Sequence, residues 1–484
     1  MSDSKGNLVD DPLVGLVAAQ RPHADPLDSQ AKSAYELDSV SALVRNLFEQ
    51  RRQDAAKMGS PDWNPLGALI SPGEPVTIKP NWVFHENHSG QGMDCLVTHA
   101  SVLGAVLELV LRARPGKVVV GDAPIQGCDL PKLMAAAGYN ALKQHYAQAG
   151  VSVEWQDFRR TVLANPEGVW DRQTDLRPLE DYVLFDLGVE SLLEPIARDS
   201  ERFRVTMYNP DLMRQTHAPG RHQYLVARDV IEADVVINLP KLKTHKKACV
   251  TGSLKNLVGI NGNKDYLPHH RLGGSRTGGD CYAGGNPFKL ASEHLSDAAN
   301  RREGMAAYLL RQTMRGTYGL ARLTGADNNL EGSWHGNDTV WRMCLDLNRI
   351  LLYGRPDGTM AEVPQRRVLA LTDAIVCGEG EGPLAPTPHP LGMLTLAINP
   401  VAAEYVHAHL MGFDWRKIPL IREAFGQFKY PLCMFQPEDV EVQFEGHRFC
   451  QPWPLWNERP FVPPKGWKGH CERQHGKNVG EVLS

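Results

Sequence analysis

Between Val235 and Arg271 the chain gathers residue types that can move protons and bind charge. The stretch opens with the apolar run Val235–Asn238, which is typical of a buried strand. Six cationic or titratable residues follow within fifteen positions: Lys241, Lys243, His245, Lys246, Lys247 and Lys255. Because the whole chain has a formal net charge of −4, this local concentration of cations predicts a site for an anion such as a phosphate or a carboxylate.

Two interpretations of this lysine-rich stretch are open. A loop of this composition is often only a solvated surface. Its place directly after a buried strand favours a binding site, because Thr251, Gly252 and Ser253 can present N–H groups and hydroxyls to an anion at the start of a helix. Three further polar residues of the stretch are expected at the same anion site: Thr244, Asn256 and Asn261.

Lys255, His245 and His270 are the candidates for chemistry within the stretch. Nearby cations disfavour the charged form of a lysine, so Lys255 could act as a nucleophile or a base, and it could equally do no more than neutralise the bound anion. His245 and His270 are candidates for proton transfer or for ligating a metal ion. His269 precedes His270 directly, and two adjacent histidines usually cannot face one metal ion, so we select His270 from the pair.

Polar residues also close two earlier apolar runs of the chain. The run Val76–Lys79 ends in a lysine and is followed by Asn81, and the run Lys117–Asp122 ends in an aspartate. In open α/β sheets, ligands bind outside the carboxyl ends of the strands. We therefore expect Lys79, Asn81 and Asp122 near the lysine-rich stretch, with Asp122 as a further catalytic candidate.

An acidic group follows a later apolar run, Val368–Leu371. Asp373, Glu379 and Glu381 lie in what we expect to be a glycine-rich turn, where carboxylates could bind Mg²⁺ or act as a base. The alternative interpretation is an exposed acidic turn whose glycines serve only the backbone geometry.

These residues must be positioned by a series of strands and helices, which the spacing of apolar residues predicts. The expected strands are Leu13–Ala19, Val76–Lys79, Lys117–Asp122, Val151–Trp155, Val235–Asn238, Val368–Leu371 and Leu391–Ile398. The expected helices are Ser33–Arg52, a helix capped by Thr98, Leu130–Ala147, residues 289–325, Val340–Leu352 and Val401–Leu410. Strands that alternate with helices predict an α/β fold with mainly parallel sheets.

The 484 residues are enough for two such units, and we expect two α/β lobes. Residues 10–290 would form an N-terminal lobe that carries the lysine-rich stretch, and residues 291–460 a C-terminal lobe with a helical insertion. Residues 461–484 are expected to be an irregular tail.

The composition excludes several classes of protein. Charged residues make up 22% of the chain and the isoelectric point is about 6.5, and aromatic residues do not interleave with the lysines, so nucleic-acid binding is disfavoured. The nine cysteines form no C-x-x-C pair, which argues against a zinc ribbon and against an iron–sulfur cluster. Acidic residues near the start disfavour a signal peptide, and no run of about eighteen apolar residues suggests a membrane span. We expect a cytoplasmic protein without a membrane partner.

Several motifs resemble a known family. The segments VTIKPNW, THASVLGAVLEL, VVVGDAP, INLPKLKTHKKACVTGSLKNLVGINGNKDYLPHHR and LTDAIVCGEGEGP are similar to those of the domain-of-unknown-function family 362, over most of residues 70–425. The resemblance implies little about activity. Many members carry an added ferredoxin-like cluster domain, whose cysteines this chain lacks. The segment GSWHGNDTVWRMCLDLNRILLY resembles a subgroup associated with biosynthetic functions.

A more distant resemblance is to the nickel-pincer lactate racemase family. His245, the Thr251–Ser253 patch, Lys255 and His270 with Arg271 follow in the order of that family's motif. The resemblance implies two α/β lobes with the site in the cleft between them, Lys255 as a cofactor anchor and His270 as a metal ligand. His99 is a candidate for the catalytic histidine of that family.

The leading hypothesis is an enzyme that acts on a small anionic substrate, phosphorylated or similar to a hydroxy acid, in an interlobe cleft. A divalent metal ion or a nickel-pincer-like cofactor at His270 and His245 would be its cofactor. The alternative is a non-enzymatic binder or carrier of a metal, a nucleotide or a cofactor. The sequence indicates no oligomeric state.

Overall fold

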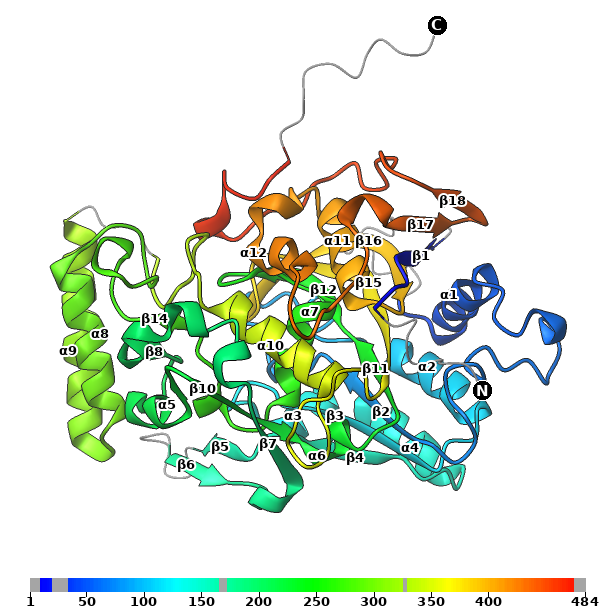
Figure 1. Ribbon diagram of the computed structural model, residues 1–484, viewed down its shortest axis with the longest axis horizontal. Coiled ribbons are helices and arrows are strands. Elements are labelled where there is room, and N and C mark those ends of the chain that lie inside the picture. Colours follow the sequence, from blue (N-terminus) through cyan, green and yellow to red (C-terminus); the bar gives the residue numbers. More distant parts are fainter. Residues whose placement is uncertain (1–8, 20–33, 165–171, 325–328, 474–484) are drawn as a thin grey trace, which may run out of the picture.

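The computed structural model describes residues 9–19, 34–164, 172–324 and 329–473. Its centre is an eleven-stranded sheet in the order β18-β17-β1-β16-β15-β11-β2-β3-β4, to which β12 adds beside β15 and β13 beside β12 (Figure 1). The strands are β1 (Leu13–Ala18), β2 (Pro75–Pro80), β3 (Lys117–Asp122), β4 (Glu154–Asp157), β11 (Val235–Leu239), β12 (Lys241–His245), β13 (Cys249–Thr251), β15 (Arg367–Glu381), β16 (Ala385–Ala397), β17 (Glu441–Phe444) and β18 (His447–Phe449).

The strands that carry the candidate residues form one parallel block. β11 lies between β2 and β15 and is parallel to both, with Val236 opposite Thr77 on one side and Val368 on the other. β3 and β4 extend the block in parallel, whereas β16 pairs antiparallel with both β15 and β1. The predicted α/β class with a mainly parallel sheet is confirmed.

The sheet is continuous across the predicted lobe boundary at residue 290. β11 precedes this boundary and β15 follows it, yet the two strands pair directly. The two predicted lobes therefore contribute strands to a single sheet, and the division of the chain into domains stays a prediction.

Both faces of the central strands of the sheet are buried, as their apolar residues require. Val235, Ile237 and Leu239 of β11 belong to the core on one face, and Val236 belongs to the core on the other face. The first face is covered by α1 (Leu37–Gln50), α2 (Ala100–Arg112), α3 (Leu130–Ala136) and α4 (Tyr139–Gln148). The second is covered by α7 (Ser253–Asn256), α10 (Val340–Tyr353), α11 (Pro400–Met411) and α12 (Pro419–Arg422).

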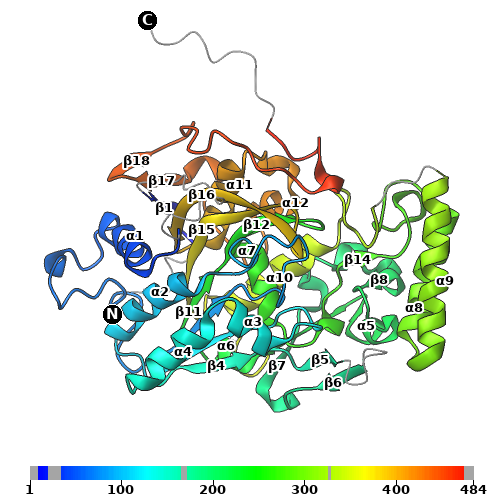
Figure 2. The same ribbon diagram turned by 180° about the vertical axis from the view of Figure 1, so that it is seen from behind.

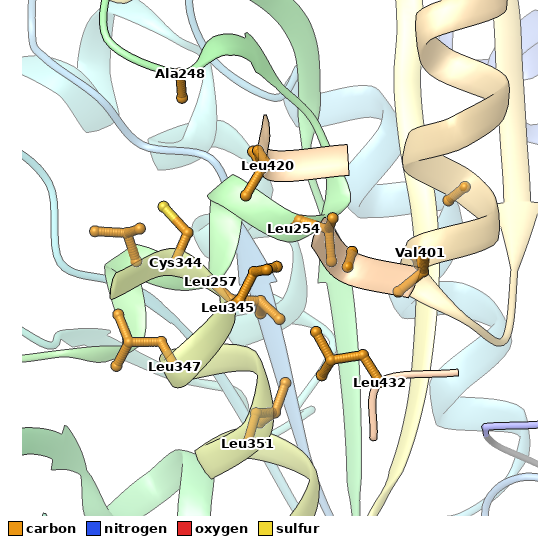
Figure 3. Packing of buried hydrophobic residues seen from close by; sticks show 14 of the residues in the cluster. Ala248, Leu254, Leu257, Cys344, Leu345, Leu347, Leu351, Val401, Leu420 and Leu432 are labelled. Carbon is orange, nitrogen blue, oxygen red and sulfur yellow. The ribbon is translucent and has the colours of Figure 1, made fainter. Parts of the chain in front are cut away.

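Figure 3 shows the second core, which supports the segment that carries Lys255. Leu254 and Leu257, on either side of Lys255 and Asn256, pack among Leu345 and Leu347 of α10 and Val401 of α11. These apolar contacts fix α7, and thereby the direction in which its polar residues point.

Smaller elements surround the sheet. A helical hairpin of α8 (Pro287–Asn300) and α9 (Gly304–Leu323) stands at the opposite end of the molecule from α1, as both views show (Figures 1 and 2). The peripheral elements are β5 (Thr161–Ala164), β6 (Arg172–Asp175), β7 (Tyr182–Asp186), β8 (Phe203–Arg204), α5 (Pro210–Thr216), β9 (His217–Ala218), β10 (Arg221–Ala227), α6 (Arg228–Ile231), β14 (His270–Arg271), α8 (Pro287–Asn300) and α9 (Gly304–Leu323). Among the described residues, no helix is both long and apolar enough to cross a bilayer.

Two local predictions are wrong. The acidic group that includes Glu379 and Glu381 lies in β15, which extends to Glu381, and not in a turn, because each residue from Val376 to Glu381 has a partner in β16. The cap of α2 is His99, whose Nδ1 accepts from the N–H of Ser101, and not Thr98, whose hydroxyl donates to the carbonyl of Leu239. The predicted tail is described as far as Arg473.

Candidate functional site

The lysines of β12 are buried at the carboxyl end of β11. Lys241 and Lys243 are both fully buried, and a β-bulge between them shifts the register of β12 against β15. These lysines therefore follow the buried strand directly, as predicted. Their burial excludes the alternative interpretation of a solvated surface loop for Lys241 and Lys243. The same edge of the sheet holds Lys79 and Asp122, which close β2 and β3.

Two of the lysines are paired with carboxylates. Lys79 Nζ lies 2.7 Å from Asp122 Oδ1, and Lys241 Nζ lies 2.6 Å from Asp373 Oδ2. All four side chains are almost completely buried. Each pair therefore satisfies its own charge within the protein, as buried ions require.

Tyr35 and His99 complete the surroundings of the Lys241 pair. The Tyr35 hydroxyl donates to Asp373 Oδ1 at 2.8 Å and accepts from Lys241 Nζ at 2.6 Å. The backbone N–H of His99 donates to Asp373 Oδ2 at 2.9 Å. The imidazole ring of His99 stacks on the ring of Tyr35, with the ring centroids 3.9 Å apart. Burial, followed by the charge of Asp373, raises the pKa of Tyr35, so the phenol stays protonated and serves as a hydrogen-bond donor.

Three asparagines connect the strands to the lysines. Asn256 Oδ1 accepts from Lys79 Nζ at 3.1 Å and from Asn81 Nδ2 at 2.8 Å, while its Nδ2 donates to Asn238 Oδ1 at 2.7 Å. Asn81 Oδ1 in turn accepts from Lys243 Nζ at 2.7 Å. This network brings Asn81, Lys79 and Asn256 together as the sequence predicted.

A second set of lysines has no carboxylate within ion-pair distance among the residues that the structure describes. Lys243 donates to Asn81 and to the carbonyl of Leu96. The others are Lys247, which donates to Thr206 Oγ1 at 3.1 Å, Lys264, which donates to the carbonyl of Ala123 at 3.1 Å, and Lys255. We call Lys243, Lys247, Lys255 and Lys264 the unpaired lysines.

Lys255 is the central member of this set. Its side chain is only 8% exposed, and within the described part of the chain it makes no hydrogen bond and no ion pair. Burial is the main cause that lowers the pKa of each of six neighbouring groups, and the positive charge of Lys255 lowers each pKa further: Lys79, Lys243, His245, Lys247, Lys264 and His269. Burial also lowers the pKa of Lys255 itself.

His245 is held as a neutral ring. Its Nδ1 accepts from the N–H groups of Lys247 at 3.0 Å and of Ala248 at 3.2 Å, so the ring proton lies on Nε2. Burial, followed by the charge of Lys255, lowers the pKa of His245 well below its ordinary value. His245 can therefore donate a hydrogen bond through Nε2, a role that the sequence did not distinguish from metal binding.

The predicted anion cradle at Thr251, Gly252 and Ser253 holds a carboxylate of the protein. α7 begins at Ser253, as predicted, but Glu404 Oε2 accepts from the Ser253 hydroxyl at 2.9 Å and from the Leu254 N–H at 3.3 Å. A Cβ atom at Gly252 would lie 2.3 Å from the same oxygen. The predicted external anion is therefore replaced at this helix start by Glu404.

Sequence reasoning missed Glu404 and its neighbour His407. Both are completely buried in α11, and His407 Nδ1 lies 3.4 Å from Glu404 Oε2. The available signal was the helical spacing of Glu404 and His407 in a mainly apolar helix, which indicates polar groups that face a buried partner.

The remaining predicted residues have structural partners. Glu379 lies 3.0 Å from His389 and 2.5 Å from Arg459, and Glu381 lies 3.2 Å from Lys246. Two more also have partners, since the Thr244 hydroxyl donates to the Gly380 carbonyl and Asn261 bonds to Leu225 and Asn263. Thr251 is the exception, because its hydroxyl is buried without a hydrogen bond among the described residues.

The predicted metal pair of His270 and His245 stays a prediction. His270 is buried on β14, next to Cys281 and Glu293, and this group does not include His245. Two backbone N–H groups engage His245 Nδ1, which leaves Nε2 as the ring nitrogen that could face a ligand. The nickel-pincer-like cofactor stays a prediction.

A hollow of about 350 Å³ opens on the Lys241 side of the site and is lined by His99, Met93 and Asp94, among others. A larger hollow of about 650 Å³, lined by Arg51 and Asp439 among others, contains none of the predicted site residues. The larger hollow therefore lies away from the lysines.

Comparison with known proteins places these residues in a family. The family model described as "Domain of unknown function (DUF362)" matches residues 76–174 and 188–409. The chain is 25% identical over 226 residues to the Thylakoid-associated protein sll1697 of Synechocystis, a match that covers 47% of each protein. The chain thus spans about half the length of this curated relative.

Two solved structures are similar at low levels. A protein from Thermotoga maritima aligns with a TM-score of 0.29 and 12% identity, over 74% of this chain and 54% of that protein. The lactate racemase apoprotein from Thermoanaerobacterium thermosaccharolyticum aligns with a TM-score of 0.25 and 10% identity, over 77% of this chain and 53% of that protein.

Proposed function

We propose that this chain, which belongs to the family described as Domain of unknown function (DUF362), is an enzyme that binds a small anionic substrate at the unpaired lysines. The substrate class is a phosphorylated compound or a hydroxy acid. Lys243 and Lys255 would bind its negative charge, and His245 would donate a hydrogen bond to it through Nε2.

One observation carries this proposal, namely that Lys255 is buried without a partner among the described residues. A buried charge without a counterion costs several kcal/mol, so such a lysine must lose its proton or receive an anion. Three further lysines without carboxylate partners surround it, and a single deprotonation would not remove their combined charge. A bound anion supplies the missing negative charge to all of them.

The lowered pKa of Lys255 suits it to chemistry as well as to binding. Burial increases the neutral fraction of the amine near neutral pH, and a neutral amine can accept a proton or attack a carbonyl carbon. When the substrate binds, its charge raises the pKa of the same amine. A Lys255 amine that is neutral when the substrate arrives can then take a proton from it, while Lys243 supplies positive charge for binding.

Turnover distinguishes an enzyme from a carrier. A panel of phosphorylated compounds and 2-hydroxy acids is incubated with the full chain in heavy water, and hydrogen exchange or product formation is followed by NMR and mass spectrometry. We expect one substrate class to react, and Lys255→Met to lose at least tenfold in rate. Lys417→Met is the matched control, because the one hydrogen bond of the Lys417 amine within the described residues goes to the carbonyl of Glu472. An equal rate for Lys255→Met and wild type would refute the assignment.

A further inference from the structure

A group of three side chains lies beside the lysines and has no role in the function proposed above. His270, Cys281 and Glu293 each offer one ligand atom, and these atoms all lie within 4.8 Å of one another. In a tetrahedral site with bonds of about 2.0 to 2.3 Å, ligand atoms are separated by about 3.5 Å. Small side-chain movements would therefore close the group around one ion.

His270 provides an independent indication of a ligand. Its side chain is 5% exposed, and its Nδ1 is sealed from solvent without a hydrogen-bond partner in the described residues. An unsatisfied buried polar atom costs about 1 to 3 kcal/mol, and such atoms in native proteins call for an explanation. An ion bound by the imidazole gives one.

The loop that carries Cys281 is folded tightly around this group. The Cys281 N–H donates to the carbonyl of Gly273 at 3.0 Å, and the Gly273 N–H donates to both carboxylate oxygens of Glu293 at 3.2 Å. A Cβ atom at Gly279 would lie 2.0 Å from the Gly273 carbonyl oxygen, so only glycine allows this approach. The glycine-rich segment thus brings a thiol and a carboxylate together.

The sulfur of Cys281 also accepts a hydrogen bond, from the N–H of Glu331 at 2.9 Å. Outer hydrogen bonds of this kind orient the ligands of metal sites. If Cys281 is a thiolate and Glu293 a carboxylate, the group carries two negative charges beside a neutral imidazole. A bound divalent cation would bring the net charge of the group to zero. In the absence of a cation, a hydrogen bond between the Cys281 thiol and the Glu293 carboxyl group would be the alternative.

We propose that His270, Cys281 and Glu293 bind a divalent transition-metal ion of the zinc type. A nitrogen, a sulfur and an oxygen ligand suit zinc and exclude magnesium and calcium, which prefer oxygen alone. Three protein ligands leave a fourth position open, the composition of sites in which zinc activates a water molecule or a substrate. Lys247 Nζ donates to Thr206 Oγ1, and the Thr206 hydroxyl donates to the carboxylate of Glu331, whose N–H binds the sulfur of Cys281. The group therefore lies close to one of the unpaired lysines.

The test uses the full chain, stripped with a chelator and titrated with Zn²⁺ or Co²⁺. We expect about one equivalent of bound zinc per chain, and with cobalt a thiolate-to-metal charge-transfer band and the strong visible bands of a tetrahedral site. Cys281→Ser should remove the charge-transfer band, and His270→Ala and Glu293→Gln should each weaken binding about 10- to 100-fold. Cys433→Ser, at another buried cysteine, should leave both measurements unchanged.

Absence of stoichiometric zinc in the wild-type chain would overturn the proposal, as would an unchanged charge-transfer band in Cys281→Ser. Circular dichroism of each variant verifies that the fold is intact, and Glu293→Gln, the most conservative change, keeps the test valid if Cys281→Ser does not fold. Sulfate binding at Lys255 is measured on the same samples. Sulfate binding without metal binding would contradict the metal site alone and leave the proposed anion site intact.

Discussion

The lysines at the carboxyl ends of the strands form two groups with opposite properties. Lys79 and Lys241 each lie within 2.7 Å of a buried carboxylate, whereas Lys255 is buried on α7 with no hydrogen bond and no ion pair among the described residues. A buried lysine that is paired with a carboxylate has its charge balanced within the protein and serves to hold the strand ends together. An unpaired one costs free energy, and its retention is explained by a ligand that brings the counter-charge.

The largest expected effect comes from breaking a pair. Lys241→Met would leave Asp373 buried without its cation, and removal of one partner of a buried ion pair typically costs about 3 to 5 kcal/mol. The free energy of unfolding, measured by denaturant titration, should fall by this amount. A loss below about 1 kcal/mol would show that the pair does not stabilise the fold.

A smaller loss of unfolding free energy is expected at Asn256, whose hydrogen bonds link the paired Lys79 to Asn81, the partner of the unpaired Lys243. Asn256→Ala removes the acceptor of Lys79 and Asn81 and the donor to Asn238. Unsatisfied buried polar groups cost about 1 to 3 kcal/mol, so the unfolding free energy should decrease within this range. Asn46→Ala, at a residue whose amide bonds only to Gln50 on an exposed helix surface, is the control and should change it little.

A lysine-to-methionine substitution in the unpaired group should not lower the unfolding free energy, in contrast to Lys241→Met. In a buffer without multivalent anions, Lys255→Met should leave the unfolding free energy unchanged or raise it by about 1 kcal/mol, since it removes a buried charge that has no partner. A loss as large as that of Lys241→Met would mean that Lys255 has an internal counterion and would erase the distinction between the groups.

The pH dependence of anion binding should be the mildest effect. Burial lowers the pKa of Lys264 to about 8, with Arg159, Lys255 and Lys79 lowering it and Asp122 opposing them. Lys264 thus loses its positive charge as the pH rises through about 8, and sulfate affinity should fall a few-fold across that interval. Lys264→Met should flatten this decline, and a decline of unchanged size in the variant would assign it to another group.

The sequence predicted the strands and the lysines well because both depend on local patterns. The run Lys117–Asp122 is β3 without change, and the segment after Val235 is a buried strand followed by buried lysines. The acidic group was misplaced because cross-strand pairing with β16 overrides the tendency of glycines to form turns.

Long-range partners could not be predicted in the same way. Glu404 lies 150 residues from Leu254, from whose N–H it accepts a hydrogen bond, and titratable residues within a buried helix do not indicate where their partner lies in the sequence. Cys281 and Glu293 are likewise an unremarkable cysteine and glutamate until the glycine-rich loop folds them against His270. Pairing across such distances follows from the tertiary fold and is not encoded in spacing.

Calorimetric titration of the full chain with sulfate, in buffers of different protonation enthalpy, tests the central claim most directly. Sulfate keeps its charge across the working pH range, so proton uptake on binding reports titratable groups of the protein and not of the ligand. We predict about one bound sulfate per wild-type chain with proton uptake, at least tenfold weaker binding by Lys255→Met, and wild-type behaviour of Lys417→Met. Equal binding by wild type and Lys255→Met, or no binding by wild type, would contradict an anion site at the unpaired lysines.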